Sequence, residues 1–204
     1  RVGGKSRPLY WHCPNNWYFE GTPERRIKGR FDELSKIRKF RESIPDWLDE
    51  LGEKELGQER WTKEIHALNQ LAPVVLRVNT LKISRNNLQK ELIKENIETQ
   101  VLKDYPDALQ LVKRSNVFLS EAFKKGLFEV QDASSQKVAP FLEVEKGMRV
   151  VDCCAGAGGK TLHLSALMQN KGQLIAMDIY ENKLFELKRR AKRNEAFNIE
   201  TKVC

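Results

Sequence analysis

Apolar residues in the last third of the chain form short continuous runs that are separated by helical spacing. Two runs, at 150–152 and 174–178, each end in an aspartate. Between them Leu162, Ala166 and Leu167 recur three to four residues apart, as on one face of a helix. A short apolar run, a helix and a second run are typical of a βαβ unit with parallel strands. The pattern therefore predicts a parallel α/β sheet here.

The same pattern divides the chain into four expected parts. Residues 1–30 are rich in glycine, proline and aromatic residues without a period, which predicts an irregular basic and aromatic arm. Residues 31–72 show helical spacing and predict three short helices, ended by Pro73. Residues 73–131 are expected to form a small α+β domain. Residues 132–204 are expected to form an incomplete doubly wound α/β domain.

The expected elements can be placed along the second half of the chain. In the small α+β domain, alternating residues predict strands at 74–80, 98–103, 109–113 and 127–131. Ser84 can cap the first helix of this domain, and a second, short helix is expected at 120–125. After Asp178 a helix carries Leu184, Leu187 and Ala191 on one side, and a third parallel strand begins at Ile199.

The segment that joins the two apolar runs is dense in glycine. Residues 152–161 read Asp-Cys-Cys-Ala-Gly-Ala-Gly-Gly-Lys-Thr, and such a turn after a parallel strand lets the backbone approach a small ligand. A phosphate-binding P-loop needs a first glycine where Cys154 stands. Asp178 instead suits the ribose hydroxyls of an adenosine-type ligand. The pattern favours that ligand, and a P-loop phosphotransferase remains an alternative.

Lys160 follows this turn and has two interpretations. It lies in the first turn of the expected helix, where the helix dipole disfavours a cation. Its presence there indicates a negatively charged neighbour, such as a substrate phosphate or a cofactor carboxylate. A plain surface lysine is the alternative.

The glycine-dense segment resembles the cofactor motif of the Fmu/Sun family of RNA (cytosine-5) methyltransferases, which commonly reads Asp-x-Cys-Ala-Ala-Pro-Gly-Gly-Lys-Thr. Gly156 and Ala157 replace alanine and proline, and both replacements are small. Residues 76–80 (Leu-Arg-Val-Asn-Thr) resemble the family's strand before its catalytic domain, and residues 130–135 (Val-Gln-Asp-Ala-Ser-Ser) resemble the start of that domain. Three motifs in the family's order extend the resemblance over most of the chain.

This resemblance implies a Rossmann-like methyltransferase sheet that is preceded by an RNA-recognition-like α+β domain and an amino-terminal helical segment. It implies S-adenosylmethionine as the cofactor and RNA as the substrate, with 16S-type ribosomal RNA first and transfer RNA next. The methionine part would lie over Gly158, where the missing side chain makes room, and the ribose would lie on Asp178. The cofactor-binding residues that it implies are Cys154, Ala155, Gly156, Ala157, Gly158, Gly159, Lys160 and Asp178.

The family's two cysteines are expected to be missing. One adds to C6 of cytosine and the other assists release, and both lie in Pro-Cys and Thr-Cys motifs on later strands. Neither motif occurs here, so the expectation is an amino-terminal fragment that contains no catalytic residue and is inactive alone. In the family the strand ending at Asp152 is central. We therefore expect it to have a bare edge through which the fragment self-associates.

Charge supports an anionic partner without identifying it. The chain has a net charge of +8, and the basic excess lies at its two ends: seven Lys/Arg against two acids in 1–30, and eleven against six in 146–204. On the helix after Asp178, residues 188, 189, 192 and 193 share one basic face, which is either solvated or in contact with phosphate. A nucleic-acid or nucleotide-binding module without catalysis is thus a further alternative.

Cysteine and histidine positions argue against other chemistry. Cys153 and Cys154 follow an apolar strand and lack a nearby histidine base, so we expect small buried hydrophobic residues rather than nucleophiles. Cys13 has one histidine beside it, and His66 and His163 stand alone, so no metal is expected. With no signal peptide and no long apolar run, the expected location is the cytoplasm, away from membranes.

Overall fold

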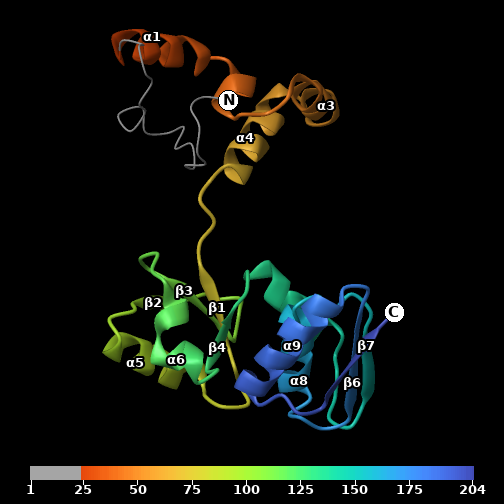
Figure 1. The fold of residues 1–204 in the computed structure, drawn as a ribbon. Helices are drawn as coiled ribbons and strands as arrows, with labels where there is room; N and C mark the ends of the chain where they lie inside the picture. Colours follow the sequence, from red (N-terminus) through yellow and green to blue (C-terminus); the bar gives the residue numbers. More distant parts are fainter. Residues whose placement is uncertain (1–23) are drawn as a thin grey trace. The chain divides into compact units, whose positions relative to one another are not determined.

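The computed structural model describes residues 24–204, which fall into two compact units that meet at the peptide between Leu71 and Ala72 (Figure 1). The first unit is helical. Its helices are α1 (Glu24–Leu34), α2 (Arg38–Arg41), α3 (Asp46–Leu56) and α4 (Gln58–Leu68). Because α1 begins at Glu24, the prediction that the irregular arm extends to residue 30 is wrong. The rest of that arm, with its aromatic residues and Cys13, lies outside the described residues.

Helices α3 and α4 pack against each other through a glycine and a tryptophan. A Cβ atom at Gly52 would lie 2.3 Å from the ring of Trp61, so only glycine lets the indole pack this closely. The indole N–H donates to Asp49 Oδ1 at 2.8 Å, and Arg38 Nε donates to the same oxygen at 2.7 Å. The aromatic and apolar spacing thus predicted α3 and α4, but the structure has four helices in this unit where three were expected, because α1 and α2 are separate.

The second unit begins with an antiparallel sheet. Its elements are β1 (Val75–Val78), α5 (Arg85–Lys94), β2 (Thr99–Val101), β3 (Ala108–Leu111), the 3-10 turn η2 (Val117–Leu119), α6 (Glu121–Lys124) and β4 (Phe128–Val130). The strand order is β2-β3-β1-β4, and every neighbouring pair is antiparallel. This βαββαβ order is ferredoxin-like, as the α+β prediction required. Ser84 caps α5 by accepting from the Asn87 amide at 3.4 Å, as expected.

Strand β1 has two chemically different faces. Leu76 and Val78 are buried in the core of the ferredoxin-like part, together with Leu88 and Leu92 of α5. Arg77 lies between them and projects to the opposite face, since successive side chains of a strand alternate. This second face is directed towards the remainder of the unit.

A parallel sheet completes the second unit. Its elements are η3 (Ser134–Lys137), α7 (Val138–Phe141), β5 (Arg149–Asp152), α8 (Gly159–Leu167), β6 (Gln173–Asp178), α9 (Glu181–Asn194) and β7 (Ile199–Val203). The strand order is β5-β6-β7, and α8 and α9 lie side by side against the sheet (Figure 1). The Rossmann-like α/β prediction is confirmed.

Strand β5 differs from the expectation in one respect. We expected a buried strand here, but Val151 is 55% exposed. Among the described strands β5 pairs only with β6, which leaves the bare edge that the sequence indicated. No helix in residues 24–204 has both the length and the apolar character that are needed to cross a membrane.

Candidate cofactor site

The glycine-dense turn lies at the carboxyl ends of β5 and β6. The Ala155 amide donates to the Met177 carbonyl at 2.9 Å, and the Gly156 amide donates to Asp178 Oδ2 at 2.8 Å. The turn that follows β5 is therefore bonded directly to the end of β6. Open parallel α/β sheets bind their ligands in the crevice outside these strand ends.

Asp178 is held as an available carboxylate. Its Oδ1 accepts from the Tyr180 amide at 2.9 Å, and its Oδ2 accepts from Gly156. These backbone bonds, that of Tyr180 first, lower the pKa of the Asp178 carboxyl below its usual value. The group is therefore ionised at neutral pH. A carboxylate has about four lone-pair sites, so it retains acceptor capacity for a ligand's hydroxyls.

Asp152 has a structural role that was not predicted from the sequence. Its Oδ2 accepts from the Thr161 hydroxyl at 2.7 Å, and its Oδ1 accepts from the Cys154 amide at 3.4 Å. Thr161 is fully buried in the first turn of α8. Asp152 therefore ties the end of β5 to the start of α8 and helps to fix the turn between them.

The three glycines of the turn have different surroundings. Gly156 has φ +52°, and Cβ atoms at Gly156 and Gly159 would meet nothing within 4 Å. Gly158 has φ +86°, and its Cβ atom would lie 2.6 Å from Cγ of the buried Leu187 on α9. The missing side chain at Gly158 is thus required by packing, which corrects the expectation that it makes room for a ligand. Open space lies at Gly156 and Gly159.

The cysteines of the turn are not buried. Cys153 and Cys154 are exposed free thiols, so the prediction of small buried hydrophobic residues is wrong. They follow β5, whose open edge leaves them accessible. The neighbouring Cys153, and then Asp178 and Asp152, raise the pKa of the Cys154 thiol. A nucleophilic cysteine requires a lowered pKa, so this environment does not activate Cys154.

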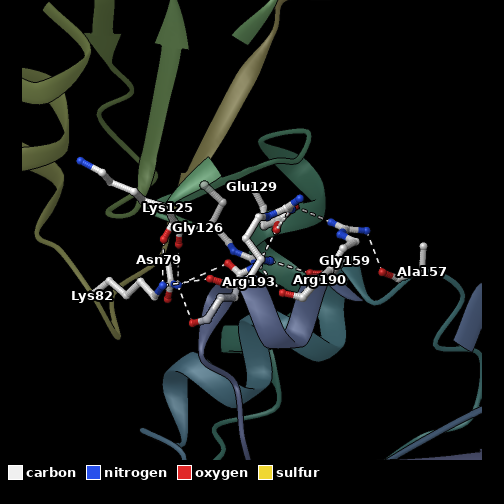
Figure 2. A network of polar contacts seen from close by, with 11 residues as sticks. Asn79, Lys82, Lys125, Gly126, Glu129, Ala157, Gly159, Arg190 and Arg193 are labelled. Atoms are coloured by element: carbon white, nitrogen blue, oxygen red, sulfur yellow. Dashed lines mark hydrogen bonds and ion pairs between the residues drawn. The ribbon is translucent and has the colours of Figure 1, made fainter. Parts of the chain in front are cut away.

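The Ala157 carbonyl of the turn is linked through Arg190 to Glu129, a buried carboxylate of the ferredoxin-like sheet (Figure 2). Glu129 of β4 accepts from Arg190 at 2.8 Å, from Asn194 at 2.5 Å and from Arg193. The other end of the Arg190 guanidinium donates to the Ala157 carbonyl at 2.7 Å. Burial alone would raise the pKa of Glu129, but Arg190, Asn194 and Arg193 outweigh it and lower the pKa.

This arrangement corrects the predicted basic face of α9. Lys188, Arg189 and Lys192 are exposed, as a solvated or phosphate-binding surface requires. Arg193 instead points inward to Glu129, and its guanidinium lies 4.0 Å from the ring centroid of Phe123. Helical spacing placed Arg193 beside the other three but could not show that α6 and β4 cover it.

Strand β1 and the segment after it make a second set of bonds to the part of the unit that contains the parallel sheet. The Arg77 guanidinium donates to the Gly159 carbonyl and to Gln131 Oε1, both at 2.5 Å. Just beyond the strand, Asn79 donates to the Asn194 carbonyl at 2.9 Å, and Lys82 donates to the Arg193 carbonyl at 2.9 Å (Figure 2). The bonds from Asn79 and Lys82 satisfy carbonyls in the last turn of α9, which have no partner within the helix.

The described histidines and acids do not form a metal centre. No three His, Cys, Asp or Glu side chains gather as metal ligands within residues 24–204. His163 of α8 is buried, with neither ring nitrogen hydrogen-bonded, and its Nε2 lies 3.9 Å from Asp107 Oδ2. Burial, and then the charge of Arg77, lowers the pKa of His163 to about 3. His163 is therefore neutral at physiological pH.

Two family models match the chain. The ferredoxin-like domain of RsmF/B-like methyltransferases matches residues 44–118, and the 16S rRNA methyltransferase RsmB/F matches residues 139–203. This chain belongs to the RsmB/F methyltransferase family. The first match begins in the helical unit and ends before β4, and the second covers all three strands of the parallel sheet; together they confirm the family resemblance. They also agree with the order of the two parts, a ferredoxin-like domain followed by a methyltransferase domain.

Curated relatives lead to the same family. The ribosomal RNA small subunit methyltransferase B of Klebsiella pneumoniae is 37% identical over 143 residues, which cover 69% of this chain and 32% of that protein. The protein of the same name in Escherichia coli is 36% identical over 140 residues, with the same coverage. The chain thus spans about a third of the length of the curated relatives that it matches.

Solved structures share the fold. A methyltransferase homologue from Pyrococcus horikoshii is 28% identical, with a TM-score of 0.73 over 84% of this chain and 55% of that chain. NSun6 from Pyrococcus horikoshii, solved with SFG, has a TM-score of 0.75 at 21% identity, covering 80% of this chain and 66% of its own. The second likeness supports the fold alone.

Proposed function

We propose that this chain carries the cofactor-binding part of an S-adenosylmethionine-dependent RNA (cytosine-5) methyltransferase. The observation that carries the proposal is the bond between the Gly156 amide and Asp178, which joins the glycine turn to the next strand end. This arrangement places an ionised acceptor beside open backbone, as an adenosine-type cofactor requires. The residues proposed to bind it are Cys154, Ala155, Gly156, Ala157, Gly158, Gly159, Lys160 and Asp178.

The residues of the turn fit this cofactor. Asp178 would accept from the ribose hydroxyls, and the open space at Gly156 and Gly159 would admit the methionine part. When bound, S-adenosylmethionine supplies an electrophilic methyl group on sulfur. Lys160 is exposed in the first turn of α8 and would attract the cofactor carboxylate or a substrate phosphate.

The substrate class follows from the relatives. The curated relatives described above are named for ribosomal RNA of the small subunit, so this RNA is the first choice and transfer RNA the second. The exposed Lys188, Arg189 and Lys192 of α9 would attract the phosphate backbone of either. No residue of the described chain is proposed as the nucleophile.

The phosphotransferase alternative fits less well. In a P-loop the hydroxyl at the position of Thr161 binds Mg²⁺. Here that hydroxyl is buried and donates to Asp152 at 2.7 Å. Thr161 is therefore used to close the turn and is not presented to a nucleotide's metal ion.

Calorimetry with S-adenosylmethionine tests the proposal. Hydrogen bonds to a charged group contribute roughly 1.5–3 kcal/mol, so Asp178→Ala should weaken binding about 10- to 150-fold. Glu181→Ala is the matched control, because Glu181 is exposed in the adjacent first turn of α9. An unchanged dissociation constant in Asp178→Ala would remove Asp178 from the site. Preferential binding of ATP with Mg²⁺ would favour the phosphotransferase.

A further inference from the structure

We propose that Arg77 and Arg190 are positioning residues for the cofactor turn, through which the ferredoxin-like sheet sets the shape of the S-adenosylmethionine site. The inference rests on the proposed function for the identity of the ligand. Neither arginine belongs to the glycine motif or to the ends of β5 and β6, so the motif alone assigns them no role. Arg77 comes from β1, 82 residues before the carbonyl that it binds.

Two carbonyls, one on each side of Gly158, are bonded to guanidinium groups. The Ala157 carbonyl accepts from Arg190 at 2.7 Å, and the Gly159 carbonyl accepts from Arg77 at 2.5 Å. Both bonds involve a charged donor, which makes them about twice as strong as bonds between neutral groups. The turn is therefore held at two points that flank the tightly packed glycine.

A held carbonyl fixes the amide that follows it. The peptide unit is planar and trans, so its C=O and N–H point in opposite directions. The bond to Arg77 thus turns the Lys160 amide away from the ferredoxin-like sheet and towards the open side of the turn. The first amides of a helix have no partner within it and are ready donors for a ligand. Arg77 thereby orients a donor that it does not touch.

The two guanidinium groups are themselves immobilised. Arg77 is 3% exposed and is braced by Gln131 Oε1. Burial lowers the pKa of Arg77 to about 10, so it remains protonated at neutral pH. Arg190 is braced by Glu129, a buried residue of β4. Because both braces come from the ferredoxin-like part or the segment directly after β4, this part determines where the turn carbonyls lie.

The experiment compares neighbouring arginines of α9 in the full chain. Arg190→Met removes the bond to the Ala157 carbonyl, while Glu129 keeps Arg193 and Asn194 as partners. Arg189→Met is the matched control, since Arg189 is exposed and, among residues 24–204, pairs only with Glu186 on its own helix. Calorimetry at a temperature where every variant is folded measures the affinity for S-adenosylmethionine and for adenosine.

The expected result is a split between the two ligands. Arg190→Met should weaken S-adenosylmethionine binding about 10-fold, the effect of losing one charge-assisted bond, and change adenosine binding less than about 2-fold. The reason is that adenosine depends on Asp178, whereas the methionine part depends on the turn. Arg190→Lys should restore little, because the guanidinium reaches Ala157 and Glu129 through two separate nitrogens, whereas lysine is shorter and has a single one. Arg77→Lys should reproduce the split.

A purely structural role would give another outcome. If Arg190→Met and Arg77→Lys lower the thermal stability but leave the affinity for S-adenosylmethionine unchanged, the inference is wrong. Spectra of ¹⁵N-glycine-labelled protein add a readout that needs no ligand: the Gly156, Gly158 and Gly159 amide signals should shift in Arg190→Met and remain in place in Arg189→Met. A wild-type chain that binds no S-adenosylmethionine would refute the proposed function, and these signals would still decide whether Arg190 sets the turn.

Discussion

The two sides of the glycine turn are built in opposite ways. On the side that faces the ferredoxin-like part, Gly158 packs on Leu187, and the carbonyls of Ala157 and Gly159 are bonded to buried guanidinium groups. On the other side, Cβ positions at Gly156 and Gly159 meet no atom within 4 Å. The same few residues therefore have a fixed side and an open side.

This difference shows how one short segment combines precision with access. A ligand loop loses affinity if it must be ordered at the moment of binding, because that ordering costs entropy. Here the packed side supplies order in advance, and the open side leaves free space beside the backbone at Gly156 and Gly159. Replacing the glycine on the packed side should therefore act mainly on stability, and replacing a glycine on the open side should act mainly on binding.

The largest expected effect is on the packed side, at Gly158. Gly158→Val would place a β-branched residue at φ +86° with its Cβ atom 2.6 Å from Leu187 Cγ. Backbone strain and overpacking together should lower the free energy of unfolding by roughly 2–5 kcal/mol. Urea denaturation followed by circular dichroism measures this. A variant of wild-type stability would show that α9 can move away and that the packed side is not rigid.

Gly159→Val is the matched test of the open side. Its Cβ atom would meet nothing within 4 Å, so the free energy of unfolding should change by no more than about 1 kcal/mol. S-adenosylmethionine binding, measured by calorimetry, should weaken at least about 10-fold, because the side chain fills space that the ligand needs. Normal affinity in this variant would contradict the placement of the ligand over Gly159.

The smallest effect is expected at His163, a buried residue of α8. Its pKa is about 3 in the folded chain and near 6.5 in an unfolded one, so the unfolded state gains a proton first as the pH falls. His163 therefore costs stability progressively below pH 6.5, at up to about 1.4 kcal/mol per pH unit. His163→Leu should flatten the decline in stability between pH 6.5 and 5.

Urea titrations of wild type and His163→Leu at several pH values measure this difference. Asp107, which faces His163 and whose pKa is raised by burial, is present in both proteins, so its contribution cancels. Parallel stability curves for the two proteins would show that His163 is not buried as a neutral group.

Most elements could be predicted because each shows its own period over enough residues. The four strands of the first sheet and the βαβαβ order of the second were predicted from alternation, apolar runs and helical spacing alone. The irregular arm was drawn too long because Ile27 is the one large apolar residue in 24–30, and its helical spacing with Phe31 and Leu34 shows only when the pattern is followed past residue 30. Helix boundaries depend on such local details.

Only part of the candidate site could be predicted from the sequence. Asp178 was identified because an acid at a strand end is a local signal, and the structure joins it to the glycine turn. Cys153 and Cys154 were expected to be buried because they follow an apolar run, but β5 ends at Asp152 and both cysteines lie in the exposed turn beyond it. Arg77 and Glu129 were missed because their partners are 82 and about 60 residues away. One signal was present in the sequence: the polar residues Arg77 and Asn79 alternate with the apolar Leu76 and Val78, which indicates a second, polar face of this strand.

The bonds at the end of α9 also bear on how freely this region can change in sequence. Asn79 and Lys82 bind carbonyl oxygens of Asn194 and Arg193, and every residue type has a carbonyl. Exchange of Arg193 for another residue would leave the Lys82 contact unaltered. Glu129 and Arg190 recognise each other's side chains and must change together. The contact between the two sheets is thus permissive at Asn79 and Lys82 and selective at Glu129. A ferredoxin-like domain from another family member would be accepted in a chimera only if it carries an acid at the position of Glu129.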